Sequence, residues 1–266
     1  MRCALRWFII FPAACGLPFG CSRAEEPKTP PPGTVKAGTD RPPVAATPAP
    51  RDAKWVRYHE ALVEAAKQSQ AEVVFIGDSI TDFWRSAGRR PWEQRLAPFR
   101  PLNLGIAGDR TEHVLWRLQN GALGNLKPRA VVLMIGTNNL KGVSAAHSVE
   151  DTAAGVAAIL KELDRRLPGV PILLLSILPR QPKYDWMAAK VKETNAKLEA
   201  LGDGRRVRFL NLHDRFLDAE GGIRAELMEA DLLHLSEKGY ETWAEAITPV
   251  LKEWVGAEPP AAKKSE

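Results

Sequence analysis

The stretch from residue 73 to residue 81, VVFIGDSIT, decides how the rest of the chain is interpreted. Its first four residues are apolar and mostly β-branched, which is typical of a strand buried on both faces of a parallel sheet. Gly77 ends this run, and Ser79 follows two residues later. A serine at the carboxyl end of a central strand lies where open α/β sheets bind ligands. Ser79 is therefore a candidate nucleophile or a helix cap, since serine also favours caps.

Apolar runs alternate with stretches of helical periodicity along the rest of the chain. We expect further strands at 100–104, 130–135, 170–177 and 207–210, and helices at 53–67, 91–96, 111–120, 149–167, 186–201 and 236–255. Thr111 is expected to cap the helix at 111–120. Such alternation predicts an α/β fold: a three-layer α/β/α sandwich around a five-stranded parallel sheet. Gly, Asn, Asp and Ser residues follow the first three strands, whose ends meet at the switch point of a doubly wound sheet.

Composition narrows the class of protein. The 266 residues are 45% hydrophobic and 26% charged, as in a globular domain. The net charge of +5 falls to +2 without residues 1–24, and no block of like charges occurs, so we expect no nucleic-acid partner. All three cysteines lie within the first 21 residues, which excludes a disulfide, a thiolate nucleophile or a cysteine metal site from the body of the chain.

The chain is expected to begin with segments outside the folded domain. Residues 1–24 have a charged start, a short apolar core and Ala24 at their end, which predicts a cleaved secretory signal peptide and an exported, periplasmic or secreted protein with no membrane span after cleavage. Lipid attachment at Cys21 is the alternative. Residues 25–52 contain eight prolines and predict a disordered linker. The domain is expected at 53–256, followed by a disordered tail at 257–266.

A serine nucleophile needs a histidine base and a group that orients it. His234 lies three residues after Asp231, just before a serine-capped helix, and this spacing lets the carboxylate reach Nδ1 while Nε2 faces Ser79. A histidine bonded to backbone beside a solvated aspartate is the alternative. The other histidines look less suitable: His59 on an exposed-looking helix face, His113 inside a helix, His147 in a loop, and His213 adjacent to Asp214.

Donors for an oxyanion are expected in the neighbouring loops. The backbone N–H of Gly108 can approach a substrate closely because glycine has no β-carbon. The backbone N–H of Ser79 is aimed by its own turn, and the side-chain amide of Asn138 can add a third donor. The alternative for Gly108 and Asn138 is that they only shape their loops, since glycine and asparagine are common turn residues.

Together these stretches resemble the SGNH, or GDSL-type, hydrolases. The pattern Gly77-Asp78-Ser79, Gly108, Gly136-x-Asn138 and Asp231-x-x-His234 has the order and strand context of that superfamily from about residue 72 to 251. The segments 103–109, 113–121, 178–180 and 233–235 resemble the branch that contains the catalytic subunits of intracellular platelet-activating-factor acetylhydrolase. Ala107 stands where that branch often has glycine.

The resemblance implies a flavodoxin-like SGNH topology and a serine esterase acting on a small, most readily acetyl, ester. It implies Ser79 as nucleophile, His234 as base, Asp231 as its orienter, and Ser79, Gly108 and Asn138 as the oxyanion hole, with no metal or cofactor. An acetylated carbohydrate or another short-chain ester is the expected substrate. The alternatives are a lipid acylhydrolase and a non-catalytic glycan-binding module. A nucleotide-binding domain is disfavoured because no Gly-x-Gly-x-x-Gly or Gly-Lys-Ser/Thr loop occurs.

Overall fold

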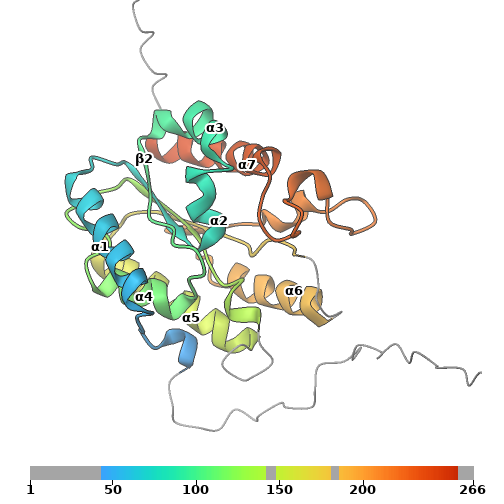
Figure 1. Ribbon diagram of the computed structural model, residues 1–266, viewed down its shortest axis with the longest axis horizontal. Helices are drawn as coiled ribbons and strands as arrows, with labels where there is room; N and C mark the ends of the chain where they lie inside the picture. The colour runs from blue at the N-terminus through green and yellow to red at the C-terminus, as the bar shows by residue number, and fades with distance from the viewer. Residues whose placement is uncertain (1–42, 142–147, 181–185, 257–266) are drawn as a thin grey trace, which may run out of the picture.

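Five parallel strands form the centre of the protein (Figure 1). The structure, a computed structural model, describes residues 43–141, 148–180 and 186–256. The strands run in the order β2-β1-β3-β4-β5, the flavodoxin-like order, which confirms the predicted sheet. They are β1 (Val73–Gly77), β2 (Pro101–Asn103), β3 (Ala130–Met134), β4 (Ile172–Leu175) and β5 (Val207–Leu210).

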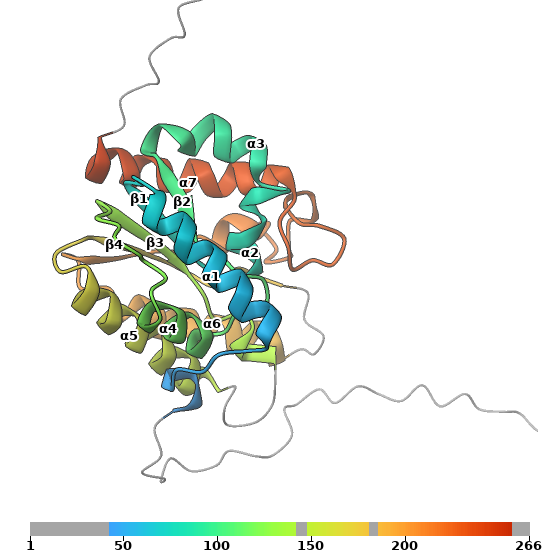
Figure 2. The ribbon, with the colours of Figure 1, turned by 60° about the vertical axis from the view of Figure 1, so that its left-hand side comes forward.

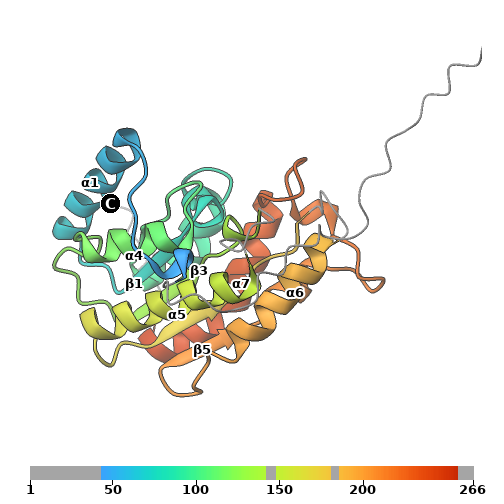
Figure 3. The same cartoon turned by 90° about the horizontal axis from the view of Figure 1, so that it is seen from below.

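Helices cover both faces of the sheet, as the alternating pattern predicts. One face carries α1 (Ala53–Gln68), α4 (Thr111–Gln119), α5 (Val149–Arg166) and α6 (Trp186–Glu199), of which α4, α5 and α6 lie side by side (Figure 3). The other face carries α3 (Arg89–Pro91), its continuation η3 (Trp92–Leu96) and α7 (Glu237–Val255) (Figure 2). The short helix α2 (Ser79–Asp82) follows β1 directly.

The pleat of the strands divides the core into two clusters. Val74 and Ile76 of β1 pack with the α1, α4, α5 and α6 side, whereas Val73 and Phe75 pack with the α7 side. Successive side chains of a strand point to opposite faces, so a strand covered on both faces must be apolar throughout. All five residues of β1 and all five of β3 are buried, which makes these central strands a firm support for the loops at their carboxyl ends.

The segment that precedes α1 is part of the folded domain. Residues 43–52, which we call the N-terminal strap, include the short helix η1 (Val44–Ala46), and η1 contacts α4 and α5. Ala45 is fully buried and its N–H donates to the Asp151 carboxylate at 3.0 Å. The prediction of a disordered linker reaching residue 52 is therefore wrong for residues 43–52, because the strap docks through its backbone. The proposed signal peptide, the linker up to residue 42 and the tail from 257 lie outside the described residues.

Local details differ from the sequence predictions at two helices. The helix expected at 91–96 begins two residues earlier, at Arg89. Thr111 is the first residue of α4 and not its cap, which is Arg110; the Thr111 hydroxyl instead donates to the carbonyl of Ala45 at 2.9 Å.

Within the described ranges, no helix is both long and apolar enough to cross a bilayer.

Candidate active site

The turn after β1 presents Ser79 at the carboxyl edge of the sheet. Asp78 caps α2, because its Oδ1 accepts from the backbone N–H of Ile80 at 3.0 Å. Ser79 is thus the first residue of α2 and not its cap, so its own N–H has no partner within the helix. Gly77 makes the turn possible, since a β-carbon there would collide with the carbonyl oxygen of Met134 on β3.

Three of the predicted site residues form one hydrogen-bonded chain. His234 Nε2 lies 3.0 Å from Ser79 Oγ, and His234 Nδ1 lies 2.6 Å from Asp231 Oδ2. A carboxylate can only accept, so Nδ1 carries the proton that is donated to Asp231, and Nε2 is left to accept from the Ser79 hydroxyl. Ser79 and His234 are 155 positions apart in sequence, yet the turn after β1 and the loop before α7 bring them together.

The loop that carries Asp231 and His234 is shaped by the carboxylate itself. Asp231 Oδ1 accepts from the backbone N–H groups of Leu233 at 3.0 Å and His234 at 2.9 Å, and Leu232 takes a left-handed conformation with φ 47°. Partial burial works to raise the pKa of Asp231, but the two N–H groups and the imidazole outweigh it and hold the pKa below its usual value. Asp231 is thus ionised at neutral pH and orients the imidazole.

An aromatic ring lies against the other side of the histidine. The ring centroids of Phe83 and His234 are 4.8 Å apart, with the planes tilted by 38°. Phe83 follows α2 directly, so the segment that carries Ser79 also packs on His234. This contact and the Asp231 bond together restrict the imidazole to the orientation that faces Ser79.

The expected oxyanion donors come from the loops after β2 and β3. Gly108 has φ 81°, a conformation that glycine adopts without strain. Asn138 Nδ2 donates to the backbone carbonyl of Asp109 at 2.9 Å, so the two loops are joined next to Gly108. Asn138 is 7% exposed and Ser79 8%, which places both in a largely water-excluded setting.

The remaining histidines have other partners. His59 is buried, not exposed as its helix position suggests, and its Nε2 lies 2.9 Å from the carbonyl oxygen of Asn120. His113 is also buried; Nδ1 accepts from the Arg110 N–H, and burial lowers its pKa to about 3. His213 Nδ1 lies 3.1 Å from the carboxylate of the adjacent Asp214. His147 lies outside the described residues.

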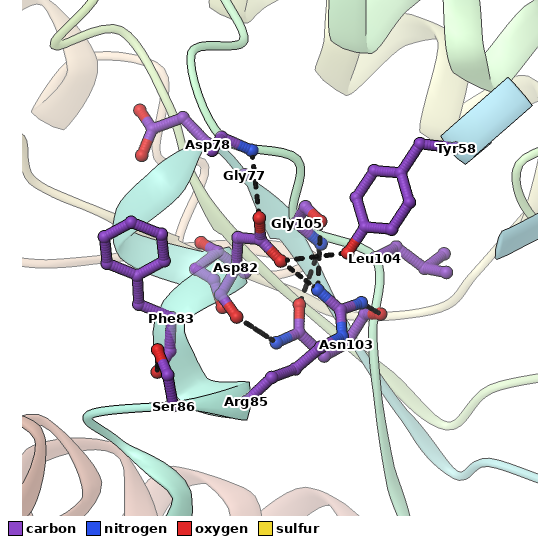
Figure 4. A network of polar contacts seen from close by, with 12 residues as sticks. Tyr58, Gly77, Asp78, Asp82, Phe83, Arg85, Ser86, Asn103, Leu104 and Gly105 are labelled. Atoms are coloured by element: carbon purple, nitrogen blue, oxygen red, sulfur yellow. Dashed lines mark hydrogen bonds and ion pairs between the residues drawn. The ribbon is translucent and has the colours of Figure 1, made fainter. Parts of the chain in front are cut away.

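A polar network that the sequence does not reveal fixes α2, which begins at Ser79, to the loop after β2 (Figure 4). Arg85 pairs with the Asp82 carboxylate and donates to the carbonyl oxygens of Asn103 and Gly105. The Asn103 amide donates to the carbonyl of Thr81 at 2.8 Å, and its Oδ1 accepts from Gly105 N–H at 2.8 Å. These bonds set the distance between α2 and the loop that contains Gly108.

Arg180 is a second site feature that sequence reasoning missed. Its Nη1 donates to the backbone carbonyl of Thr137 at 3.2 Å, next to Asn138, and burial lowers the pKa of its guanidinium. Asp78 is fully buried nearby, and burial raises the pKa of its carboxyl to about 7 although the Ile80 N–H bond opposes this. The only earlier sign of Arg180 was its place in the 178–180 segment similar to the acetylhydrolase branch.

The helix that follows His234, α7, is hydrogen-bonded to α2 as well. The hydroxyl of Tyr240, on α7, donates to the carbonyl oxygen of Ile80, on α2, at 2.7 Å. Tyr240 is fully buried.

Among the described residues, no group of three or more His, Cys, Asp or Glu side chains is arranged to hold a metal ion.

Comparison with known proteins identifies the family of this chain. A model of the GDSL-like lipase/acylhydrolase family matches residues 75–242, which include the Ser79 turn and the Asp231–His234 loop. The chain belongs to this family. Members of the GDSL-like family are lipases and acylhydrolases by name, so this GDSL-family chain is a carboxylic ester hydrolase.

Individual proteins are similar to this GDSL-family chain in sequence or in fold. It is 34% identical over 201 residues to the human platelet-activating factor acetylhydrolase IB subunit alpha1, covering 75% of this chain and 84% of that protein. A solved GDSL-like lipase from Bacteroides thetaiotaomicron shares the fold, with a TM-score of 0.60, 21% identity, and coverage of 75% of this chain and 96% of the other. A variant of an acetyl-xylooligosaccharide esterase from Geobacillus has a TM-score of 0.55 at 18% identity, covering 72% and 97%.

Proposed function

We propose that this chain is an exported serine esterase that hydrolyses a small, most readily acetyl, ester through Ser79, His234 and Asp231. The observation that carries the proposal is the continuous relay of two hydrogen bonds, 3.0 Å from Ser79 Oγ to His234 Nε2 and 2.6 Å from His234 Nδ1 to Asp231. A base within hydrogen-bond reach of the hydroxyl, held in one tautomer by a carboxylate, is what a serine nucleophile requires.

The reaction proceeds in two halves. Ser79 Oγ bonds to the ester carbonyl carbon while its proton passes to His234 Nε2, and the former carbonyl oxygen becomes an oxyanion held by the N–H groups of Ser79 and Gly108 and the Asn138 amide. The carbon–oxygen bond to the alcohol then breaks, and the alcohol takes the proton from the imidazolium. Water next attacks the acyl-enzyme, gives one proton to His234, and releases the acid as Ser79 recovers its proton.

The choice of an acetyl ester follows from the relatives. Proteins 34% identical to this chain over 201 residues are named acetylhydrolases. We propose an acetylated carbohydrate or another short-chain ester as substrate; a lipid acetyl ester is the second candidate, because the 34% identical relatives are named for platelet-activating factor. A panel of acetylated sugars and short-chain acetyl lipids, compared by kcat/KM, decides between these alcohols.

Turnover of p-nitrophenyl acetate by wild type and Ser79→Ala tests the chemistry. The variant is expected to lose several orders of magnitude in kcat, and Asn138→Ala about 100-fold or more, as for other oxyanion donors. Equal rates in wild type and Ser79→Ala refute the assignment. A fluorophosphonate probe provides a second readout: labelling of wild type but not of Ser79→Ala is expected, and no labelling of either supports the non-catalytic binding module.

We also propose export, on the basis of the charged and apolar start of the sequence. Cell fractionation of the full chain is expected to place it outside the cytoplasm, with a mature N-terminus after Ala24. A Cys21→Ala variant separates the two processing routes, since only a lipid-anchored protein changes its membrane association when this thiol is lost.

A further inference from the structure

The N-terminal strap ends against the loop that carries the proposed oxyanion donor. Arg51 Nη1 donates to the backbone carbonyl of Ala107 at 2.8 Å and lies 3.6 Å from the Asp109 carboxylate. The guanidinium also lies over Gly108: a β-carbon built there would be 3.1 Å from Arg51 Nη1. Arg51 precedes residue 75, where the match to the family model begins.

We propose that Arg51 is a positioning residue that fixes the direction of the Gly108 N–H. The carbonyl of Ala107 and the N–H of Gly108 belong to one peptide group, which is planar and trans, so the two bonds point in opposite directions. A donor that holds the carbonyl on one side therefore holds the N–H toward the other. The same bond polarises the amide, which makes its N–H a stronger donor.

The need for such a restraint comes from Gly108 itself. Glycine populates positive and negative φ about equally, so the peptide group before Gly108 is easily rotated. Rotation about this peptide turns the N–H away from the position of the oxyanion and replaces it with a carbonyl oxygen, which repels negative charge. Arg51 opposes that rotation by binding the carbonyl oxygen in the orientation with φ 81° at Gly108.

The other side of the same loop is held from the nucleophile helix. The Ala107 N–H donates to Asp82 Oδ2 at 3.2 Å, and Asp82 belongs to α2. The buried Asp109 carboxylate accepts from Trp55 Nε1 at 2.7 Å and pairs with Arg117 at 2.8 Å. The two residues that flank Gly108 are thus fixed by α2, α1 and α4, and the Ala107–Gly108 peptide group is held at its carbonyl by Arg51.

Arg51 is well anchored for this role because residues on both sides of it are bound. Asp52 caps α1 by accepting from the Trp55 N–H at 3.0 Å, and the Ala49 N–H donates to the carbonyl of Glu112 at 3.2 Å. The residues that Arg51 contacts have other partners: Asp109 keeps Trp55 and Arg117, and the Ala107 N–H keeps Asp82. Removal of the Arg51 side chain is therefore expected to change the loop and not the fold.

The inference rests on the proposed esterase function, and kinetics of full-length variants test it. Arg51→Ala is expected to lower kcat for p-nitrophenyl acetate roughly 10- to 100-fold, because a misplaced oxyanion donor costs about this much, with KM within about twofold of wild type. Phosphonylation by a fluorophosphonate, whose P–O oxygen occupies the same hole, is expected to slow in parallel. Arg57→Ala, which removes an exposed arginine of α1, is the matched control and is expected to behave as wild type.

The conservative variant Arg51→Lys keeps one donor and is expected to retain more of kcat than Arg51→Ala. Arg51→Met keeps the aliphatic stem but has no donor, so it replaces Arg51→Ala as the assay protein if the alanine variant proves unstable; wild-type kcat and labelling rate in Arg51→Met then contradict the proposal. An unchanged kcat in Arg51→Ala overturns it, as does a raised KM with unchanged kcat, which indicates a substrate contact. Equal rates in wild type and Ser79→Ala overturn the proposed function and this inference together, whereas loss in Ser79→Ala with none in Arg51→Ala overturns only the inference.

Discussion

Replacing Asp78 by asparagine is expected to change how the stability of this protein depends on pH. The carboxyl is fully buried in the turn that carries Ser79, and burial raises its pKa from 3.8 to about 7. Between about pH 4 and pH 7 the folded protein therefore keeps a proton that the unfolded chain has lost. Stability from this group is complete below about pH 4 and is lost as the pH rises through about 7.

The size of the effect follows from the interval between the two pKa values. They differ by about three units, and each unit corresponds to about 1.4 kcal/mol, so the group contributes about 4 kcal/mol to the pH dependence. Asp78→Asn removes this titration while its side-chain oxygen still accepts from the Ile80 N–H. The variant is expected to gain up to about 4 kcal/mol in unfolding free energy, relative to wild type, between pH 4 and pH 8.

Urea unfolding followed by tryptophan fluorescence at several pH values measures this difference. Asp164→Asn, which alters an exposed aspartate on α5, is the matched control and is expected to give a curve parallel to wild type. A difference between Asp78→Asn and wild type that stays constant from pH 4 to pH 8 refutes the reasoning, because the carboxyl then titrates alike in the folded and unfolded states.

Two further substitutions test the site and its support. Asp231→Asn is expected to lower kcat by roughly 100- to 1000-fold, less than the roughly 10⁴-fold loss known for a buried orienting aspartate. The loss is smaller because the Asp231 side chain is 48% exposed, so water replaces part of its effect on His234. A loss below about threefold in steady-state kinetics contradicts an orienting role. Gly77→Ala is expected to destabilise the fold by about 3 kcal/mol, because the added methyl group collides with the carbonyl of Met134, and an unchanged melting temperature is the contrary result.

The fold could be predicted because its signals are local in the chain. Each expected strand is a short apolar run, and the structure places all five in one parallel sheet. The candidate site residues that belong to a short motif could be predicted for the same reason. Ser79 follows a strand, and Asp231 lies three residues before His234. The spacing of that last pair also fixes their contact, since the carboxylate binds the intervening backbone N–H groups.

Features that depend on backbone contacts over long distances could not be predicted. The N-terminal strap docks through the N–H groups of Ala45 and Ala49, which leave no pattern of side chains, so its proline content alone suggested disorder. His59 was expected on an exposed face, but its partner is a carbonyl at Asn120, 61 residues away. Arg51 reaches its partner across 56 residues and likewise has no sequence signal.

The hydroxyl of Tyr240 links the helix that carries Ser79 to the helix that follows His234. His234 precedes α7 by three residues, Ser79 begins α2, and the bond from Tyr240 to the Ile80 carbonyl ties these helices to each other. A movement of α7 that keeps this hydrogen bond therefore moves α2 in the same direction. The distance between Ser79 and His234 is therefore set in part by how α2 is bonded to α7, and the proposed relay is already formed without a bound ester.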